Sequence, residues 1–223
     1  KVLEEVRGAA EIANGQMLQV DFDKLQEKQE SVVRQLVGGV ESLLQAAGVK
    51  VVKGAGILAP GGVSVGGEVI AADKVIIATG ASPLTILGIK PDGKQVFTAR
   101  EIWQLEALPE SMVVLGGGVI GVEFATIFSS LGTKVTIVER EKSILPQFAP
   151  QAARQAAKRL QDRGVEILTN TTVTGYREQD AALIAGDVEI KGDVLLVALG
   201  NKANTVGLGL EENGVSLNQR GEI

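Results

Sequence analysis

The chain has 223 residues, of which 45% are apolar, and it carries a formal net charge of −5 at pH 7. This composition predicts a globular protein with a sizeable core, folded as one large domain or two ordinary ones. Basic residues are interspersed with acidic ones, which argues against a surface that binds nucleic acid. The longest apolar runs are far shorter than the roughly 20 residues that span a bilayer, so we expect no membrane segment.

Neither cysteine nor histidine occurs in the sequence. The chain therefore lacks a thiol nucleophile, a disulfide, an imidazole base and the usual zinc ligands, and we expect no metal site. Residues 1–15 alternate charged with apolar positions and lack the continuous hydrophobic stretch of a secretory signal. A cytoplasmic protein is the resulting expectation.

The first predicted element is a long amphipathic helix that begins near Lys24. We expect Asp23 to cap it, with Gln26 completing a capping box. Gly48 is expected to end the helix, whereas Gly38 and Gly39 mark either a bend or a close approach by another backbone. The apolar residues at helical spacing are Leu25, Val32, Leu36, Val40, Leu43 and Leu44.

Residues 49–80 contain short β-prone runs separated by glycine and proline, as expected for a small sheet. The last of these runs, at 73–80, reads as an apolar strand that ends at Thr79 and Gly80. The run at 193–203 has the same order of an aspartate, an apolar strand and a glycine. We therefore expect a strand in each of these two segments.

A different kind of segment follows. Thr98 and Glu101 form a T-x-x-E capping box, which predicts a short helix before Pro109. We place a domain boundary near residues 88–98.

Strands and helices alternate in the second half of the chain. A series of this kind, whose last strand is apolar throughout, predicts a parallel sheet covered on both faces. The fold class is therefore α/β, with a Rossmann-like domain. The predicted elements are a strand at 112–115, a helix from the next glycines to Gly132, a strand at 134–139, a helix at 150–163, and strands at 165–168 and 194–200.

Gly116, Gly118 and Gly121 form G-x-G-x-x-G between a predicted strand and a predicted helix. The first glycine permits the turn, the second lets a pyrophosphate approach, and the third lets the helix pack on the strand. Glu139 ends the next strand, about 20 residues on, where a carboxylate accepts hydrogen bonds from ribose hydroxyls and repels a 2′-phosphate. The sequence predicts a dinucleotide site that favours NAD over NADP, with a ligand-free glycine turn as the alternative.

Two further positions fit the same site less specifically. Glu123 lies one turn into the predicted helix, near where a nicotinamide would lie, but a solvated helix carboxylate explains it equally well. Gly200 ends the last apolar strand, where either a cofactor or a plain turn accounts for a glycine. The sequence leaves both alternatives open.

Several segments together resemble the flavoprotein disulfide reductases, which are pyridine nucleotide-disulfide oxidoreductases. Their order and spacing match that family over essentially the whole chain. The segments are "VIIATGASP", "PESMVVLGGGVIGVEFATIFSSLGTKVTIVE", "SILPQF", "VLLVALGNKANT" and "GVSLNQRGEI".

This family has an FAD domain interrupted by an NAD domain, and then an interface domain that forms a homodimer. The resemblance implies a partial FAD domain at 1–92, an NAD domain at 93–212 and a return toward the FAD domain at 213–223. The residues implied to approach FAD are Gly56, Thr79, Gly80 and Ala81. The residues implied to line the NAD site are Gly116, Gly117, Gly118, Val119, Ile120, Gly121, Val122, Glu123, Glu139, Val173 and Gly200.

The family passes electrons from a dithiol, through a cysteine pair and FAD, to NAD. Within the family, the chain is most similar to the dihydrolipoyl dehydrogenases, which are homodimers that act on a lipoyl-bearing protein. The family's first G-x-G-x-x-G, its cysteine pair, its Gly-Asp flavin contact and its histidine base are missing here. We therefore expect an interior fragment with an incomplete FAD site and no activity of its own.

Two other readings stay open. One is another enzyme of the same family, such as a mercuric reductase, a transhydrogenase or an NADH oxidase, because the partner is selected by regions that this chain lacks. The other is a non-catalytic NAD-binding module, since no acid-base or nucleophilic residue is evident in the chain.

Overall fold

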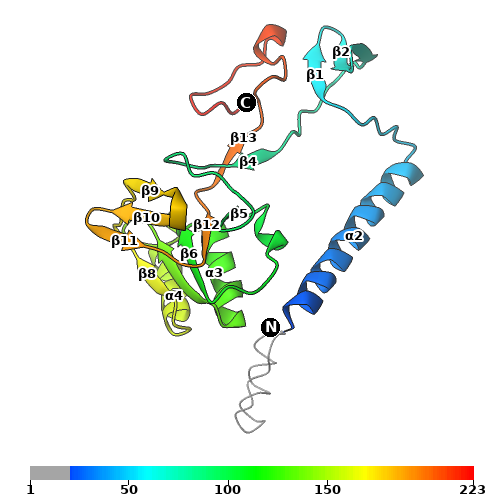
Figure 1. Cartoon of the computed structure of the whole chain (residues 1–223). Helices are drawn as coiled ribbons and strands as arrows, with labels where there is room; N and C mark the ends of the chain where they lie inside the picture. The colour runs from blue at the N-terminus through cyan, green and yellow to red at the C-terminus, as the bar shows by residue number, and fades with distance from the viewer. Residues whose placement is uncertain (1–20) are drawn as a thin grey trace. The chain divides into compact units, whose positions relative to one another are not determined.

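The computed structural model of the chain describes residues 21–223 (Figure 1). Contacts divide the chain into two units, one containing Pro83–Gly200 with Lys1–Gln29 and the other containing Glu30–Ser82 with Asn201–Ile223. The domain limits expected near residues 92 and 212 stay predictions. Among the described residues, no helix is both long enough and apolar enough to cross a membrane.

A five-stranded parallel sheet forms the centre of the first unit. Its strands lie in the order β5, β12, β6, β7 and β8, and each neighbouring pair is parallel. The predicted parallel α/β sheet is thereby confirmed. The bounds are Val96–Thr98 for β5, Val194–Val197 for β12, Ser111–Leu115 for β6, Lys134–Val138 for β7 and Glu166–Leu168 for β8.

Both faces of this sheet are covered. Successive side chains along each strand point to opposite sides, so each strand contributes to two cores. Helices α3 (Val119–Leu131) and α4 (Pro150–Gln161) contribute to the core on one face. A small antiparallel sheet of β9, β10 and β11 contributes to the core on the other face. In the central strand, Met112 and Val114 belong to the helix-side core, whereas Val113 and Leu115 belong to the opposite core.

Helix α3 ends where the sequence predicts. Gly132 adopts a left-handed conformation with φ of 103°, and its N–H reaches the carbonyl oxygens of the last helical turn. The predicted Thr98–Glu101 box also forms, because the Glu101 carboxylate accepts hydrogen bonds from the Thr98 N–H and hydroxyl. It precedes a single 3₁₀ turn, η1 (Ile102–Gln104).

Helix α2 (Phe22–Ala46) begins earlier than predicted. Asp21, not Asp23, caps it, because Asp21 Oδ1 accepts the Lys24 N–H at 3.1 Å. Gln26 does not complete a capping box; its side-chain amide donates instead to the backbone oxygen of Leu105. The expected cap was wrong by two residues: Asp23 and Gln26 match the capping-box pattern, but the helix begins at Phe22, so Asp21 occupies the N-cap position.

The apolar side chains of α2 are exposed. None of its residues is buried, and Leu36 and Leu43 are 65% and 72% exposed. The helix runs without a break through Gly38 and Gly39, as Figure 1 shows, and no described atom lies within 4 Å of a Cβ placed at either glycine. The tandem glycines therefore mark no close backbone approach within residues 21–223.

The second unit contains the predicted small sheet. Strands β1 (Gly56–Ala59), β2 (Gly62–Val65) and β3 (Glu68–Ala71) form an antiparallel meander. Two short strands, β4 (Ala81–Pro83) and β13 (Asn201–Ala203), pair with each other. A 3₁₀ turn, η3, follows at Glu211–Asn213.

The strand expected at 73–80 is absent. This segment is extended without strand pairing, and Ile76 in its middle is 91% exposed. A strand needs a hydrogen-bonded neighbour, and no described residue supplies one here. The expected strand was wrong, because composition along the chain does not show whether a neighbouring strand is present to pair with it.

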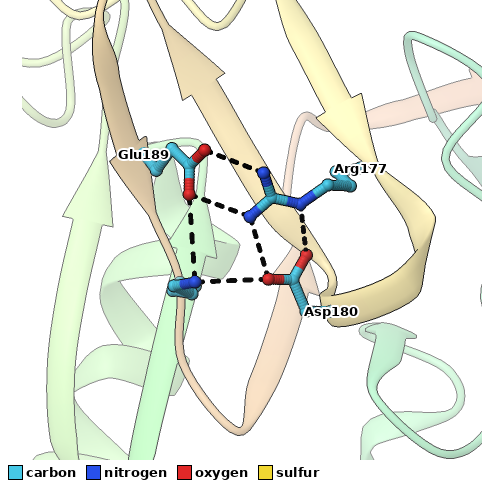
Figure 2. Close-up of polar contacts among 4 residues, drawn as sticks. Arg177, Asp180 and Glu189 are labelled. Carbon is cyan, nitrogen blue, oxygen red and sulfur yellow. Dashed lines mark hydrogen bonds and ion pairs between the residues drawn. The ribbon is translucent and has the colours of Figure 1, made fainter.

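An ionic cluster links β9 (Gly175–Arg177), the 3₁₀ turn η2 (Glu178–Asp180) and β11 (Val188–Ile190) across β10 (Ala182–Ala185). The Arg177 guanidinium binds two carboxylates, each through two hydrogen bonds, as Figure 2 shows. Its shortest contacts to Asp180 and Glu189 are both 2.8 Å. The planar fork of arginine suits such paired contacts, which hold the turn against the hairpin.

The cluster changes the acidity of its members. Hydrogen bonds from Arg177, followed by those from Lys191, hold the pKa of Asp180 well below its usual range. Hydrogen bonding to Arg177 also lowers the pKa of Glu189. Because both folded pKa values are lowered, the cluster stabilises the fold fully above the unfolded pKa values near 4 and loses this effect as the pH falls through the folded values.

The cluster predicts a pH-dependent effect of Arg177→Gln. Near pH 6 we expect this variant to unfold at a lower temperature than the wild type, and the difference should shrink as the pH falls below about 4. Thermal unfolding followed by circular dichroism measures it. Arg34→Gln removes the same charge from a single exposed pair with Glu30 and serves as the control. An Arg177 difference that is constant from pH 6 to pH 3 would contradict the assigned role.

Candidate functional site

A cleft of about 740 Å³ opens in the first unit. Its walls include Leu115, Val138 and Ala198, at or just beyond the carboxyl ends of β6, β7 and β12, together with Val119 at the start of α3. In open parallel sheets, ligands bind in the crevice at this end of the strands. The topology therefore places the cleft where a ligand is expected.

Many residues predicted for the NAD site line this cleft: Gly116, Gly118, Val119, Ile120, Glu139, Val173 and Gly200. Others support the same loop and helix without lining it: Gly117, Gly121, Val122 and Glu123. The Glu123 side chain is exposed on α3. Its suggested place near a nicotinamide stays a prediction.

Two glycines of the motif let three backbone segments converge. A Cβ on Gly116, which has φ of 110°, would lie 2.5 Å from the carbonyl oxygen of Ala198. A Cβ on Gly121 would lie 2.0 Å from the carbonyl oxygen of Gly116. Any side chain at either position would push α3 or β12 away from β6, so both glycines are required by packing.

Gly118 differs from both. It is the N-cap of α3, and a Cβ placed there would meet no atom within 4 Å. Since Gly118 also lines the cleft, its missing side chain leaves space on the ligand side and not on the core side. The first-turn N–H groups of the helix have no intrahelical acceptor, so this space suits an anionic group such as a pyrophosphate.

Glu139 follows β7 and binds the glycine loop directly. Its Oε2 accepts the Gly117 N–H at 2.7 Å, and its Oε1 accepts the Glu141 N–H at 2.8 Å. Each carboxylate oxygen has a second lone pair, so these bonds leave acceptors for ribose hydroxyls. The carboxylate therefore lies at the cleft wall with a fixed orientation.

Sequence reasoning missed the residues at 145–148, which form another wall. The Leu145 N–H donates to the carbonyl oxygen of Gly117 at 2.8 Å, and Ile144 packs where a Gly117 Cβ would lie. Leu145 has φ of 51°, an uncommon conformation for a branched side chain. The only sequence signal was the "ILP" run, which carried the family resemblance without a stated role.

Arg140 and Glu141 also line the cleft but were not predicted. Their side chains form an exposed ion pair with 3.1 Å between Arg140 Nη2 and Glu141 Oε1. Thr171 and Thr172 lie in the wall as well, and the Thr171 N–H donates to the backbone oxygen of Glu139. A single sequence shows no pattern that links these loops.

The residues predicted to approach FAD lie in the second unit. Gly56 begins β1, whereas Thr79 and Gly80 lead into β4, where Ala81 lies. The Thr79 hydroxyl donates to the backbone oxygen of Asn204 at 2.7 Å, and Gly80 accepts the Asn204 N–H. Their expected approach to FAD stays a prediction.

Comparison with protein families gives a match over residues 1–223 to the family described as pyridine nucleotide-disulphide oxidoreductase. The chain belongs to that family. Membership confirms the resemblance seen in the sequence. The predicted α/β class is confirmed by the same match.

Curated relatives carry one name. The chain is 40% identical over 195 residues to a dihydrolipoyl dehydrogenase of Acholeplasma laidlawii, covering 84% of this chain and 58% of the relative. It is 36% identical to the dihydrolipoyl dehydrogenase of Geobacillus stearothermophilus, covering 92% of this chain and 46% of the relative. The chain thus spans about half the length of the curated relatives it matches.

Solved structures of similar fold agree. LpdA of Mycobacterium tuberculosis matches with a TM-score of 0.86 at 26% identity, covering 99% of this chain and 50% of that one. The HOCl-induced flavoprotein disulfide reductase RclA of Escherichia coli matches with a TM-score of 0.79 at 29% identity, covering 91% and 48%. Both structures resemble this chain in fold as well as in sequence.

The glycine geometry predicts a contrast between two substitutions. Gly121→Ala should destabilise the chain by about 1–3 kcal/mol or more, because the new methyl overlaps the Gly116 carbonyl. Gly118→Ala should cost less than about 1 kcal/mol, because its methyl enters open space at a helix N-cap. Urea unfolding of both variants measures the difference. Equal destabilisation would contradict the assignment of Gly118 to the ligand side of the loop.

Proposed function

We propose that the cleft of the first unit binds NAD as part of a dithiol-oxidising flavoenzyme. The observation that carries the proposal is the open space at Gly118, between the N-terminus of α3 and the Glu139 carboxylate. A pyrophosphate would lie against the first-turn N–H groups, and the adenosine ribose would lie at Glu139. When bound, NAD supplies a hydride acceptor; the residues of this chain bind and orient it.

The preference for NAD over NADP follows from the charges at Glu139. A 2′-phosphate there would lie beside the Glu139 and Glu141 carboxylates, both of which line the cleft. Arg140 is the nearby cation, and it pairs with Glu141. The local charge therefore repels an added phosphate and leaves the ribose hydroxyls as the better ligands.

We infer that the parent protein is a dihydrolipoyl dehydrogenase, a homodimer that receives electrons from a lipoyl-bearing protein. Support comes from the names of the curated relatives, at 33–40% identity. This chain contains no cysteine and no histidine, so the dithiol chemistry of such an enzyme would need residues outside it. The chain by itself is then expected to bind nucleotide without oxidising dithiols.

NADH titration tests the nucleotide site. Binding of NADH should change the emission of Trp103 or raise the fluorescence of NADH itself. The wild-type chain should bind NADH at least about tenfold more tightly than NADPH. Gly118→Ala should weaken NADH binding by about tenfold or more, because its methyl fills the phosphate position, while leaving stability nearly unchanged. Glu139→Ala should weaken the binding of NADH and reduce the preference for NADH over NADPH. Unchanged NADH affinity in both variants would refute the site.

Flavin content tests the second cofactor. Gly56, Thr79, Gly80 and Ala81 are proposed to contact FAD in the parent, where other regions would complete the site. The chain purified alone should therefore be nearly colourless and should bind added FAD poorly. Absorbance near the flavin bands, compared with protein concentration, measures this. A stoichiometric yellow preparation would contradict the proposed incompleteness.

Two other candidates stay distinguishable. Mercuric reductases, transhydrogenases and NADH oxidases share the family, and the sequence that flanks this chain in its parent separates them from a dihydrolipoyl dehydrogenase. A non-catalytic NAD-binding module would bind NADH equally well, but its full-length form would show no reduction of flavin by NADH.

A further inference from the structure

The backbone of Gly117 is held on both sides of its Cα. Its N–H donates to Glu139 Oε2 at 2.7 Å, and its carbonyl oxygen accepts the Leu145 N–H at 2.8 Å. The residue itself is buried, and a Cβ placed on it would lie 2.8 Å from Ile144 and 3.1 Å from Glu139 Oε2. The middle of the glycine loop is thus fixed by two segments that are distant in sequence, with no freedom left for another side chain.

The bond from Gly117 has a consequence for the loop's hydrogen bonding. Because the Gly117 N–H is already paired with a carboxylate, it is not available to a phosphate. The donors that face the cleft begin only at Gly118 and the first turn of α3. The position of those donors depends on where Gly117 is held.

Glu139 is in turn fixed by its own surroundings. Its second oxygen accepts the Glu141 N–H at 2.8 Å, and its backbone is bound to Leu168 and Thr171 of the neighbouring strand and loop. Hydrogen bonds to a carboxylate are stronger than those between neutral groups. The side chain is therefore a rigid brace between the end of β7 and the glycine loop.

We propose that Glu139 is a positioning residue of the phosphate-binding loop as well as the acceptor for the ribose. Its carboxylate sets the Gly117 peptide and, through it, the N–H groups that bind the pyrophosphate. The ribose and pyrophosphate subsites are thereby coupled through one side chain. The inference rests on the proposed nucleotide site for its ligand but not for the Gly117 hydrogen bond, which exists in the free protein.

The two roles are separated by measuring the affinities of two ligands for the wild type and for two Glu139 variants. Calorimetry is used to measure the binding of ADP and 2′,3′-dideoxy-ADP to the full chain as wild type, Glu139→Ala and Glu139→Gln. The dideoxy nucleotide has no ribose hydroxyls for Glu139 to bind. If Glu139 only binds ribose, Glu139→Ala leaves the affinity for dideoxy-ADP unchanged, and the proposal is overturned. If it also positions the loop, Glu139→Ala weakens dideoxy-ADP by about tenfold.

The control is Glu178→Ala, which removes an equal charge from the exposed turn η2, outside the residues that line the cleft. It should leave dideoxy-ADP binding equal to that of the wild type. Loss of the Glu139 charge also favours a diphosphate electrostatically, so weaker binding in Glu139→Ala cannot arise from charge. The Glu139→Gln variant keeps one acceptor oxygen, so its affinity for dideoxy-ADP should lie between those of the wild type and Glu139→Ala. This variant tests the proposal if Glu139→Ala does not fold.

Amide exchange tests the brace without any ligand. In the free wild-type chain, exchange of the Gly117 amide measured by NMR should be slow, and it should become at least about tenfold faster in Glu139→Ala. The Gly116 amide, which donates to Val138 O at 2.9 Å, should keep its rate and serves as the internal reference. Failure of both nucleotides to bind the wild type would sink the proposed function, whereas an unchanged Gly117 exchange rate would sink the positioning role.

Discussion

The first unit depends on the close approach of three backbone segments at the end of β6. Gly121 brings α3 against the Gly116 carbonyl, and Gly116 brings the turn against Ala198 at the end of β12. No side chain fits between these segments. This packing places the N-terminus of α3 at the carboxyl ends of the strands. The loops after β7, β8 and β12 form the walls of the cleft there.

The sheet keeps this arrangement rigid, because its two faces are buried in separate cores. Residues of β6, β7 and β12 alternate between the helix-side core and the core beneath the small antiparallel sheet. Arg177 stabilises this antiparallel sheet through its hydrogen bonds to Asp180 and Glu189. The glycine loop is thus built on strands that have little room to shift.

The sequence was informative wherever the pattern depended on neighbours along the chain. Alternating apolar residues and glycine stops located β6, α3, β7 and β12, and the motif located the cleft. It was wrong where the outcome depended on a distant partner. The run at 73–80 has strand composition but no strand pairing in the described residues, and the cap was expected at Asp23 although Asp21 caps the helix.

The loop braces belong to the same class of missed features. The sequence singled out Glu139 as a ribose acceptor and not as a partner of Gly117; this bond joins residues that approach only after β7 has paired with β6. Leu145 could not be chosen from its sequence, since neither its type nor its spacing indicates a positive φ. Such contacts are properties of the assembled sheet and its loops, and no local pattern encodes them.

One further bond bears on how such a protein is assembled from parts. The Leu84 N–H donates to the Gly200 carbonyl at 2.9 Å, so the chain enters and leaves the 83–200 segment at adjacent points. A segment whose two ends already meet can be inserted into a host domain, or removed from it, without opening a gap in either. The 83–200 segment contains every residue that lines the cleft, so the whole cleft lies between two chain ends that are already adjacent.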